Sequence, residues 1–250
     1  MRNAFLTTYS IIAWTVMLIT SIIITPFFLL TWVLSFWWDR RRVVTHMMGT
    51  FWAWHYQSLI PFWKLSLTGR KKIPWSKPVI IVANHRSLVD ILALYKIRRP
   101  FKWVSKRENF RLPFVGWVLA LSKSIPIDRQ NMRSGMQFIA KAQQSIKEGS
   151  SVIIFPEGTR SKSSAMKKFR EGAFLLAKRM KVPIIPVVHI GTEKTFQSGK
   201  KSWILKGKAT IKIKVLDKIP LDIIDALSID ELSDYTRKKM EEGLQELENK

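Results

Sequence analysis

The chain has 250 residues, of which 47% are hydrophobic, and its 42 basic and 18 acidic residues give a formal net charge of +24. This composition excludes a disordered or fibrous chain, and the length suits one sizeable core, or one domain with an appendage, rather than two full domains. The absence of cysteine excludes disulfides, cysteine-ligated metal sites and a catalytic thiolate. Such an excess of positive charge predicts a polyanionic partner: nucleic acid, anionic lipid or a phosphorylated substrate.

The N-terminal segment carries no charged residue over 36 positions, from Asn3 to Trp38. Because a transmembrane helix needs about 20 apolar residues, this segment is long enough to span a bilayer, or to enter it and turn back. Tryptophans crowd its far end and three arginines follow at 40–42, which is typical of a membrane interface. A single span would place the basic body in the cytoplasm, whereas a helix bent near Pro26 would leave both of its ends on one side.

A second uncharged stretch follows the arginines, from Val43 to Trp63. It is too polar for a spanning helix, and its aromatic residues favour a helix that lies along the bilayer surface. We therefore expect a membrane-embedded or interfacial helical segment over residues 1–66, and an α/β domain over residues 67–250. A long apolar helix inside a soluble core is the alternative, although soluble helices of this length usually have a charged face.

Short apolar runs alternate with helical stretches in the rest of the chain. The predicted strands are 78–83, 151–155, 182–190 and 209–216. The first three are rich in β-branched residues and typical of strands buried on both faces, while the last alternates strictly and indicates a half-buried strand nearer an edge. The predicted helices are 88–97, 109–121, 131–148 and 171–180. This order predicts an α/β fold with a mostly parallel central sheet covered by helices.

A C-terminal helix is expected to begin near Ser228, because Ser228 and Glu231 have the spacing of a capping box. The apolar face predicted for this helix consists of Leu232, Tyr235, Met240, Leu244 and Leu247.

The first motif with chemical potential, N-H-R-S-L-V-D at 84–90, directly follows a predicted buried strand. Ligands of open α/β sheets gather at the carboxyl ends of the strands, so His85 arrives at the expected functional edge. On a regular helix His85 and Asp90 would lie about 140° apart, so they meet only if the helix begins after His85. The carboxylate would then fix the tautomer and leave the other ring nitrogen as a general base. Ser87 and Asp90 also match a capping box, so a structural role for Asp90 is the alternative.

The second motif, F-P-E-G-T-R-S at 155–161, follows another predicted strand. Gly158 permits tight backbone geometry and Arg160 can bind a phosphate with two hydrogen bonds, although a turn with a solvent-facing arginine is the plainer interpretation. Two looser motifs are I-P-I-D-R at 125–129 and V-P-I-I-P-V at 182–187. By themselves they indicate an exposed ion pair after a short strand, and a strand edge beside a pocket wall.

In this order the four motifs resemble those of the glycerolipid acyltransferase family, over about residues 78–190. The first and second motifs at this separation are highly specific. The resemblance implies that His85 is a general base and that Asp90 orients it. The residues that it implies in binding the acceptor headgroup are Arg129, Glu157, Gly158, Thr159 and Arg160, with Lys106 as a weaker candidate.

The reaction implied by this resemblance transfers an acyl chain from a thioester to the sn-2 hydroxyl of 1-acyl-sn-glycerol-3-phosphate, and gives phosphatidate. Acyl-CoA or acyl-carrier protein would be the donor substrate, with no bound cofactor and no metal. The expected partners are lysophosphatidate and anionic membrane lipids, not nucleic acid. The expected location is the inner membrane, with the catalytic domain on its cytoplasmic side.

Three other functions are compatible with parts of the sequence. The acceptor could be a different lysophospholipid. A membrane-tethered polyanion-binding protein would use the +24 charge, but no nucleic-acid-binding motif accompanies that charge. A non-catalytic membrane scaffold would leave His85 and Asp90 with no role beyond helix capping.

Overall fold

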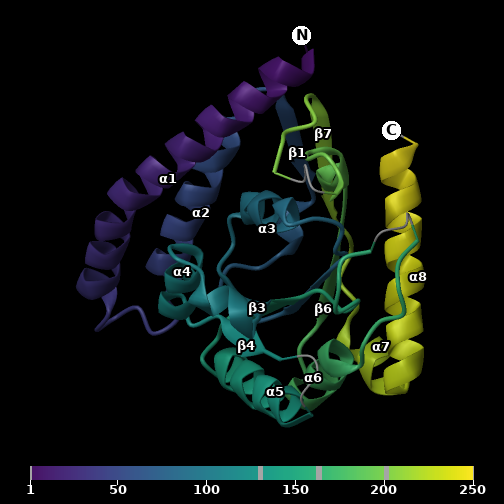
Figure 1. The fold of residues 1–250 in the computed structure, drawn as a ribbon. Coiled ribbons are helices and arrows are strands. Elements are labelled where there is room, and N and C mark those ends of the chain that lie inside the picture. The colour runs from purple at the N-terminus through teal and green to yellow at the C-terminus, as the bar shows by residue number, and fades with distance from the viewer. Residues whose placement is uncertain (1, 129–131, 162–164, 200–202, 250) are drawn as a thin grey trace.

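The computed structural model of this chain describes residues 2–128, 132–161, 165–199 and 203–249. In this part of the chain a seven-stranded sheet has the order β1-β7-β6-β2-β5-β3-β4 and is covered by helices (Figure 1). The strands are β1 (Trp63–Thr68), β2 (Ile80–Ala83), β3 (Phe101–Lys106), β4 (Ile125–Ile127), β5 (Ser151–Ile154), β6 (Ile184–Ile190) and β7 (Ala209–Val215).

The sheet is mixed but mostly parallel, which confirms the predicted α/β fold. Strands β6, β2, β5, β3 and β4 run in one direction, β7 is antiparallel to β6, and β1 is parallel to β7. The edge strand β1 has no fully buried residue, so its sequence lacks the apolar signal that identified the central strands. It pairs with β7 from Trp63 onward, so the sheet begins before the boundary suggested between residues 66 and 67.

The central strands are buried on both faces because their alternate side chains enter two separate cores. Ile80 and Val82 of β2 pack into the core formed with α5 (Met132–Lys147), α6 (Gly172–Met180), α7 (Leu221–Ala226) and α8 (Ile229–Glu248). Ile81 and Ala83 pack into the other core, on the side of α2 (Val43–Ser58), α3 (Val89–Leu94) and α4 (Val115–Leu121). Each fully buried isoleucine contributes about 1.5–3 kcal/mol relative to an exposed one.

The helix predicted at 109–121 is divided into two pieces. A 3₁₀-helix, η3 (Arg107–Arg111), is followed by a turn and then by α4. Pro113 lies in this turn, where it cannot donate a backbone hydrogen bond to a continuous helix.

The C-terminal helix α8 begins as predicted. The side chain of Ser228 accepts a hydrogen bond from the backbone N–H of Glu231, and the Glu231 carboxylate accepts one from the N–H of Ser228. The inclusion of Tyr235 in the apolar face is wrong, because this side chain is 38% exposed. The buried face also includes small and polar residues, such as Thr236 and Gly243, which let the helix approach the sheet closely.

The position predicted for the V-P-I-I-P-V motif, at a strand edge, is wrong. Pro186 lies inside β6, an interior strand between β7 and β2. The carbonyl of Pro186 accepts a hydrogen bond from the N–H of Leu216 (2.9 Å), the residue that follows β7. The carbonyl and the nitrogen of Pro186 therefore both point toward β7 and not toward β2. The proline nitrogen cannot return a hydrogen bond to Leu216, and the paired ladder with β7 ends at the preceding pair, Val187 and Val215.

An antiparallel pair of helices, α1 (Arg2–Ser35) and α2, lies along one side of the molecule (Figure 1). The segment Asn3–Ser35 is long and apolar enough to cross a membrane, and only 22% of its most apolar window is buried. Near the start of α1, Trp14 Nε1 donates a hydrogen bond to the carbonyl of Trp203 (2.8 Å), and Ser10 Oγ accepts one from the N–H of Leu205 (2.9 Å). Its apolar outer surface makes this helix the membrane-associating part of the chain.

The turn between α1 and α2 is fastened to the sheet by a buried lysine. Lys102 of β3 is 2% exposed, and its Nζ donates hydrogen bonds to the carbonyls of Arg41 (2.8 Å) and Ser122 (2.7 Å). Burial lowers the pKa of Lys102 to about 7, and Asp39 partly offsets this effect. The carboxylate of Asp39 accepts hydrogen bonds from the N–H groups of Val43 and Val44 at the start of α2. The two ends of α1 are therefore both held against the α/β body.

Substitution of Gly243 by valine should weaken the docking of α8 onto the sheet. A Cβ at this position would lie 2.8 Å from both methyl carbons of Leu216 and 3.3 Å from a methyl carbon of Val188, so these buried side chains would have to shift. Overpacking of this kind costs about 1–3 kcal/mol, so we expect a lower free energy of unfolding in Gly243→Val by denaturant titration. Glu242→Val, at the exposed neighbouring position, is the matched control. Equal stability of the two variants would contradict this packing.

Candidate active site

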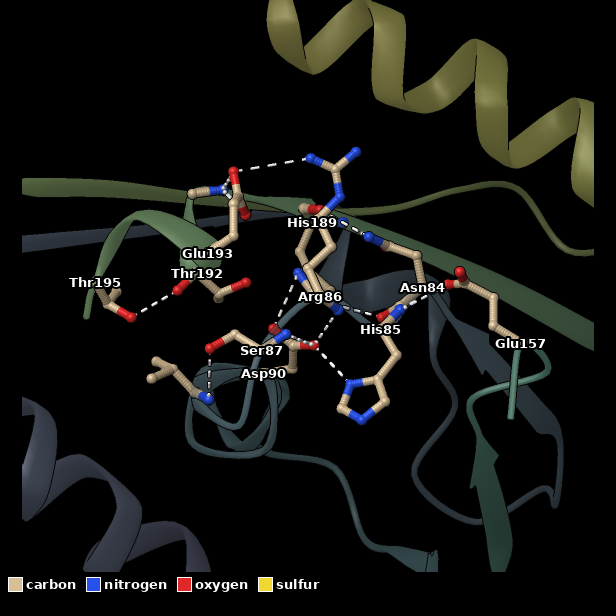
Figure 2. A network of polar contacts seen from close by, with 12 residues as sticks. Asn84, His85, Arg86, Ser87, Asp90, Glu157, His189, Thr192, Glu193 and Thr195 are labelled. Carbon is tan, nitrogen blue, oxygen red and sulfur yellow. Dashed lines mark hydrogen bonds and ion pairs between the residues drawn. The ribbon is translucent and has the colours of Figure 1, made fainter. Parts of the chain in front are cut away.

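The site is built where β2 ends and the chain turns into α3. Strand β2 is fully buried up to Ala83, and α3 begins at Val89, so residues 84–88 form a turn at the carboxyl edge of the sheet. This turn brings His85 and Asp90 together although they are five residues apart. Their side chains meet with His85 Nδ1 and Asp90 Oδ2 2.8 Å apart (Figure 2).

Asp90 is fully buried and its carboxylate serves the imidazole and the backbone at once. Besides His85 Nδ1, its Oδ2 accepts hydrogen bonds from the backbone N–H groups of Arg86 (2.6 Å) and Ser87 (2.9 Å). Asp90 therefore also plays part of the helix-capping role that was the alternative interpretation of this motif. Ser87 Oγ accepts from the N–H of Val89 instead of that of Asp90, so the reciprocal capping box is incomplete.

The environment of Asp90 keeps its carboxylate ionised. Burial acts to raise its pKa, but the charge interaction with His189 and the hydrogen bond and charge interaction with His85 oppose this effect, as does the N–H of Ser87. The pKa of Asp90 is consequently below its ordinary value. An ionised carboxylate accepts a hydrogen bond from Nδ1–H of His85, which fixes the proton on Nδ1 and leaves Nε2 as the basic nitrogen of the ring.

The imidazole of His85 is held by stacking as well as by this hydrogen bond. Its ring lies on that of Phe155, with centroids 4.2 Å apart and planes inclined by 14°. Phe155 in turn stacks on Trp103 of β3, with centroids 6.0 Å apart. The side chain of His85 is 12% exposed, so the imidazole lies at the boundary between the core and the solvent.

The P-E-G-T-R-S segment wraps around the backbone of His85. The Glu157 carboxylate accepts the N–H of His85 (2.9 Å) with one oxygen and the N–H of Lys167 (3.2 Å) with the other. The carbonyl of His85 accepts the N–H of Ser161 (2.8 Å). Glu157 is 5% exposed, so the structure places this predicted headgroup ligand in the support of the turn.

The other predicted ligands lie around this support. Gly158 has a φ of 72°, which favours glycine, and a Cβ there would lie 2.6 Å from Arg170 Nε, so any other residue would displace the Arg170 side chain. The side chains of Thr159 and Arg160 are exposed, and Lys167 Nζ donates to Thr159 Oγ1 and to the carbonyl of Arg160, both at 2.9 Å.

Two more predicted ligands come, in the sequence, at or after the ends of neighbouring strands. Lys106 ends β3, is exposed, and forms an ion pair with Glu108 at 2.9 Å. Arg129 lies outside the described residues, two positions after the end of β4. Because β2, β5, β3 and β4 are parallel and adjacent, the segments that follow them all emerge at the edge that holds His85.

The sequence did not identify Asn84 and His189, which complete the support of the turn (Figure 2). The Asn84 side chain donates to the carbonyl of His189 and accepts its N–H, both at 2.9 Å, and His189 Nε2 lies 2.7 Å from the carbonyl of Asn84. Nδ1 of His189 lies 3.8 Å from Oδ1 of Asp90, and within the described residues neither atom has a hydrogen-bond partner. His189 is the penultimate residue of β6, beside β2, so its place near the end of a predicted strand was the available signal.

Cavities lie on both faces of the sheet, and the larger of the two described next is lined in part by residues of the site. One of about 100 Å³ lies between α2, α3 and α4, and its wall is almost wholly apolar, with residues such as Trp52, Leu92, Tyr95 and Val118. A second of about 270 Å³ lies between β5, α5 and α6, and Phe155, Gly158 and Arg170 contribute to its wall. Within the described residues there is no cluster of three or more side chains suited to hold a metal ion.

Comparison with known proteins identifies acyltransferases as relatives of this chain. A family model described as Acyltransferase matches residues 64–190. The chain is 36% identical over 203 residues to a 1-acyl-sn-glycerol-3-phosphate acyltransferase of Chlamydomonas reinhardtii, an alignment that covers 80% of this chain and 60% of that protein. It is 32% identical over 208 residues to a chloroplastic protein of the same name from Brassica napus, with 82% and 58% covered.

Bacterial proteins are also similar. A 1-acyl-sn-glycerol-3-phosphate acyltransferase of Pseudomonas aeruginosa is 37% identical over 127 residues, covering 50% of this chain and 49% of that protein. The crystal structure of the 1-acyl-sn-glycerophosphate acyltransferase from Thermotoga maritima matches with a TM-score of 0.83 at 22% identity, covering 100% of this chain and 99% of that one, which shows a shared fold. The chain spans about 60% of the length of the first two relatives.

Removal of the Glu157 carboxylate should loosen the turn that carries His85. Glu157→Ala would leave the partly buried N–H groups of His85 and Lys167 without this acceptor, at a total cost of about 1–3 kcal/mol because water can reach part of the site. We expect faster amide hydrogen exchange in peptides that cover residues 84–90, and a smaller effect in Glu157→Gln, which keeps one acceptor oxygen. Glu171→Ala, at an exposed position, is the control. Exchange that is unchanged relative to this control would contradict the supporting role.

Proposed function

This chain belongs to the acyltransferase family, and on that premise we propose that it transfers an acyl chain from a thioester to the sn-2 hydroxyl of 1-acyl-sn-glycerol-3-phosphate. The relatives from C. reinhardtii, B. napus and P. aeruginosa carry the name of this activity. The observation that carries the proposal is the His85–Asp90 pair, stacked on Phe155 at the carboxyl edge of the sheet.

The first step is proton removal from the acceptor. An alcohol is a weak nucleophile at neutral pH, so a base must take its proton during the attack. His85 suits this task because Asp90 holds the Nδ1 proton, which leaves the lone pair of Nε2 for the hydroxyl. Asp90 also stabilises the imidazolium that forms.

The second step exchanges a thioester bond for an ester bond. The deprotonated oxygen attacks the thioester carbonyl, the carbon–sulfur bond breaks, and the thiol leaves with the proton carried by the imidazolium. This direct transfer needs no acyl-enzyme, which agrees with the absence of cysteine from the chain.

The negatively charged end of the acceptor binds at the basic groups around this edge. Arg160 is exposed next to the turn of His85, and its guanidinium can hold a phosphate with two hydrogen bonds. Lys106, the last residue of β3, adds positive charge at this edge, and we propose the same role for Arg129, which comes two positions after β4 in the sequence. Anchoring the phosphate in this way orients the sn-2 hydroxyl toward Nε2 of His85. The apolar cavity between α2, α3 and α4 offers room for part of an acyl chain.

The substrates and partners follow from this chemistry. The donor is acyl-CoA or acyl-carrier protein, both of which carry a thioester, and neither a bound cofactor nor a metal is needed. Anionic lipids of the bilayer are the partner of the basic body, whose charge contributes to the +24 of the chain.

The location proposed for the enzyme is the inner membrane, with its catalytic domain on the cytoplasmic side. Helix α1 has 34 residues and is about 50 Å long, yet hydrogen bonds hold its beginning to the loop 203–205 and the turn after it to Lys102. A helix held to one body at both ends favours insertion into one leaflet over a complete span. The arginines at 40–42 favour the cytoplasmic side.

The catalytic roles predict two different losses of turnover. His85→Ala should abolish acyl transfer, and Asp90→Asn should lower kcat about 10⁴-fold by leaving the histidine in the wrong tautomer. The measurement is thiol release from acyl-CoA and from acyl-carrier protein, with lysophosphatidate and other lysophospholipids as acceptors. His55→Ala, on α2 and away from the site, is the matched control. Near-normal turnover of folded His85→Ala would exclude the general-base role.

The headgroup contact predicts a change in acceptor affinity. Arg160→Ala should raise KM for lysophosphatidate by roughly 10–100-fold, the effect of one lost charge-assisted hydrogen-bonding group, with a smaller rise in Arg160→Lys. Arg179→Ala, an exposed arginine at the end of α6, is the control for charge alone. If Arg160→Ala and Arg179→Ala show the same acceptor kinetics, Arg160 does not bind the phosphate.

Membrane insertion predicts resistance to extraction. The full-length protein should stay with the membrane fraction through washes in high salt and alkaline carbonate, since salt screens electrostatic attraction but does not remove buried apolar area. Quantitative release by salt alone would show that the apolar surface of α1 is not in lipid.

A further inference from the structure

A second apolar surface lies on α4 and the turn before it. Leu112 is 50% exposed, Val115 52% and Trp117 48%. Single exposed apolar side chains are ordinary, but three large ones within six residues form a patch that calls for a partner.

Basic residues flank this patch on both sides. Arg107 and Arg111, in η3, precede it, and Lys123 follows it; all three are exposed. An apolar stretch between cationic groups matches the boundary of an anionic bilayer, where the apolar groups enter the hydrocarbon and the cations meet the headgroups.

The patch is continuous with the helices that associate with the membrane. The end of α4 is joined to the α1–α2 turn, because Lys102 Nζ binds the carbonyls of Arg41 and Ser122, and Lys123 Nζ donates to the carbonyl of Arg40 (3.4 Å). In this turn Trp37 is 86% exposed and Trp38 68%. Figure 1 shows α4 beside α2, on the side of the sheet that α1 occupies.

Helices α2 and α4 also share a boundary. Both form the wall of the apolar cavity of about 100 Å³, to which Val115 contributes. The outer face of α2 exposes Phe51 (47%) and Trp54 (51%). Exposed apolar side chains are thus present on α1, α2 and α4, and α2 contacts both other helices on this side of the molecule.

The backbone before α4 turns the patch outward. Phe114 has φ 61° and ψ −61°, and the N–H of Val115 donates to the carbonyl of Pro113 (2.6 Å), which is a γ-turn of the rare positive-φ type. The turn leaves Phe114 facing the cavity, with its ring 5.3 Å from that of Trp117, while Leu112 and Val115 stay exposed. Strain of this kind persists where the surrounding structure requires it.

We propose that the segment 112–117 enters the hydrocarbon of the same leaflet as α1 and α2, so that three elements, not two, form the membrane-binding surface. This inference rests on the proposed membrane position of α1. The occupant of the patch is the bilayer, with anionic headgroups at Arg107, Arg111 and Lys123. The outer rim of the cavity between α2, α3 and α4 then faces lipid instead of water.

The absence of cysteine allows a direct test with single nitroxide labels. Labels at Leu112→Cys, Val115→Cys and Trp117→Cys of the full-length protein would be compared in vesicles of phosphatidylcholine and phosphatidylglycerol. Ile22→Cys, on the exposed face of α1 (57%), is the lipid control. Tyr235→Cys, on α8, is the aqueous control, because α8 packs on the other face of the sheet. The readout is the collision rate of each label with oxygen and with a water-soluble nickel chelate.

The labels at 112, 115 and 117 should behave like the label at 22, with high access to oxygen and a loss of access to the nickel chelate. If they behave like the label at 235 while the label at 22 is in lipid, this proposal is overturned and the proposed position of α1 stands. If the label at 22 is itself in water, both fail. Acyl transfer by each labelled protein reports separately on the proposed activity.

A second measurement avoids new labels at the patch. Brominated lipids quench tryptophan fluorescence only at close range, so the quenched fraction should fall in Trp117→Phe, which preserves an aromatic ring. Trp203→Phe, an exposed tryptophan of the loop next to α1 (43%), gives the comparison. No change in quenched intensity for Trp117→Phe would place this side chain outside the bilayer.

Discussion

The buried carboxylate of Asp90 imposes the tightest requirement on this molecule. Removing a carboxylate from water costs several kcal/mol unless donors and positive charge compensate it. Here Oδ2 accepts from His85 Nδ1 and from two backbone N–H groups, and His189 lies 3.8 Å from Oδ1. These contacts exist only if residues 84–88 adopt one conformation, so the chain around them must hold that turn in place.

Other segments meet this requirement from both neighbouring strands. On the β6 side, three hydrogen bonds join Asn84 to His189. On the β5 side, Glu157 and Ser161 bind the N–H and the carbonyl of His85. The backbone at His85 is thus fixed by contacts within the protein itself, which is the preorganisation that the proposed general base would need. The same arrangement explains why part of a motif expected to bind substrate is engaged with the protein itself.

The two faces of the sheet serve different surroundings. The face under α5–α8 carries a conventional core and a C-terminal helix whose outer side is charged. On the other face, α2–α4 cover the core, and the outer sides of α2 and α4 expose apolar side chains that no other described part of the chain covers. Lys102 joins two parts of this second face, because its buried amino group donates to a carbonyl of the α1–α2 turn and to a carbonyl at the end of α4. The placement of the membrane-facing helices therefore depends on a residue of the sheet.

Local sequence patterns determined much of this protein. Apolar runs identified β2, β5 and β6 because strands buried on both faces have no polar alternation, and the capping box at Ser228 located the start of α8. The order of the motifs indicated the family, and parallel strand order explains why segments far apart in sequence meet at one edge.

Only the tertiary structure decided the rest, since it depends on contacts between distant residues. The edge strand β1 forms because β7 supplies its hydrogen bonds, while its own residues show little burial. The sequence predicted that Glu157 binds substrate, yet its carboxylate oxygens accept hydrogen bonds from the N–H groups of residues 85 and 167. His189 looks like one more residue of an apolar strand, and it gains its place beside Asp90 only through the pairing of β6 with β2. Periodicity reports which side of an element is buried, whereas the partner of a buried polar atom is fixed only when the strands assemble.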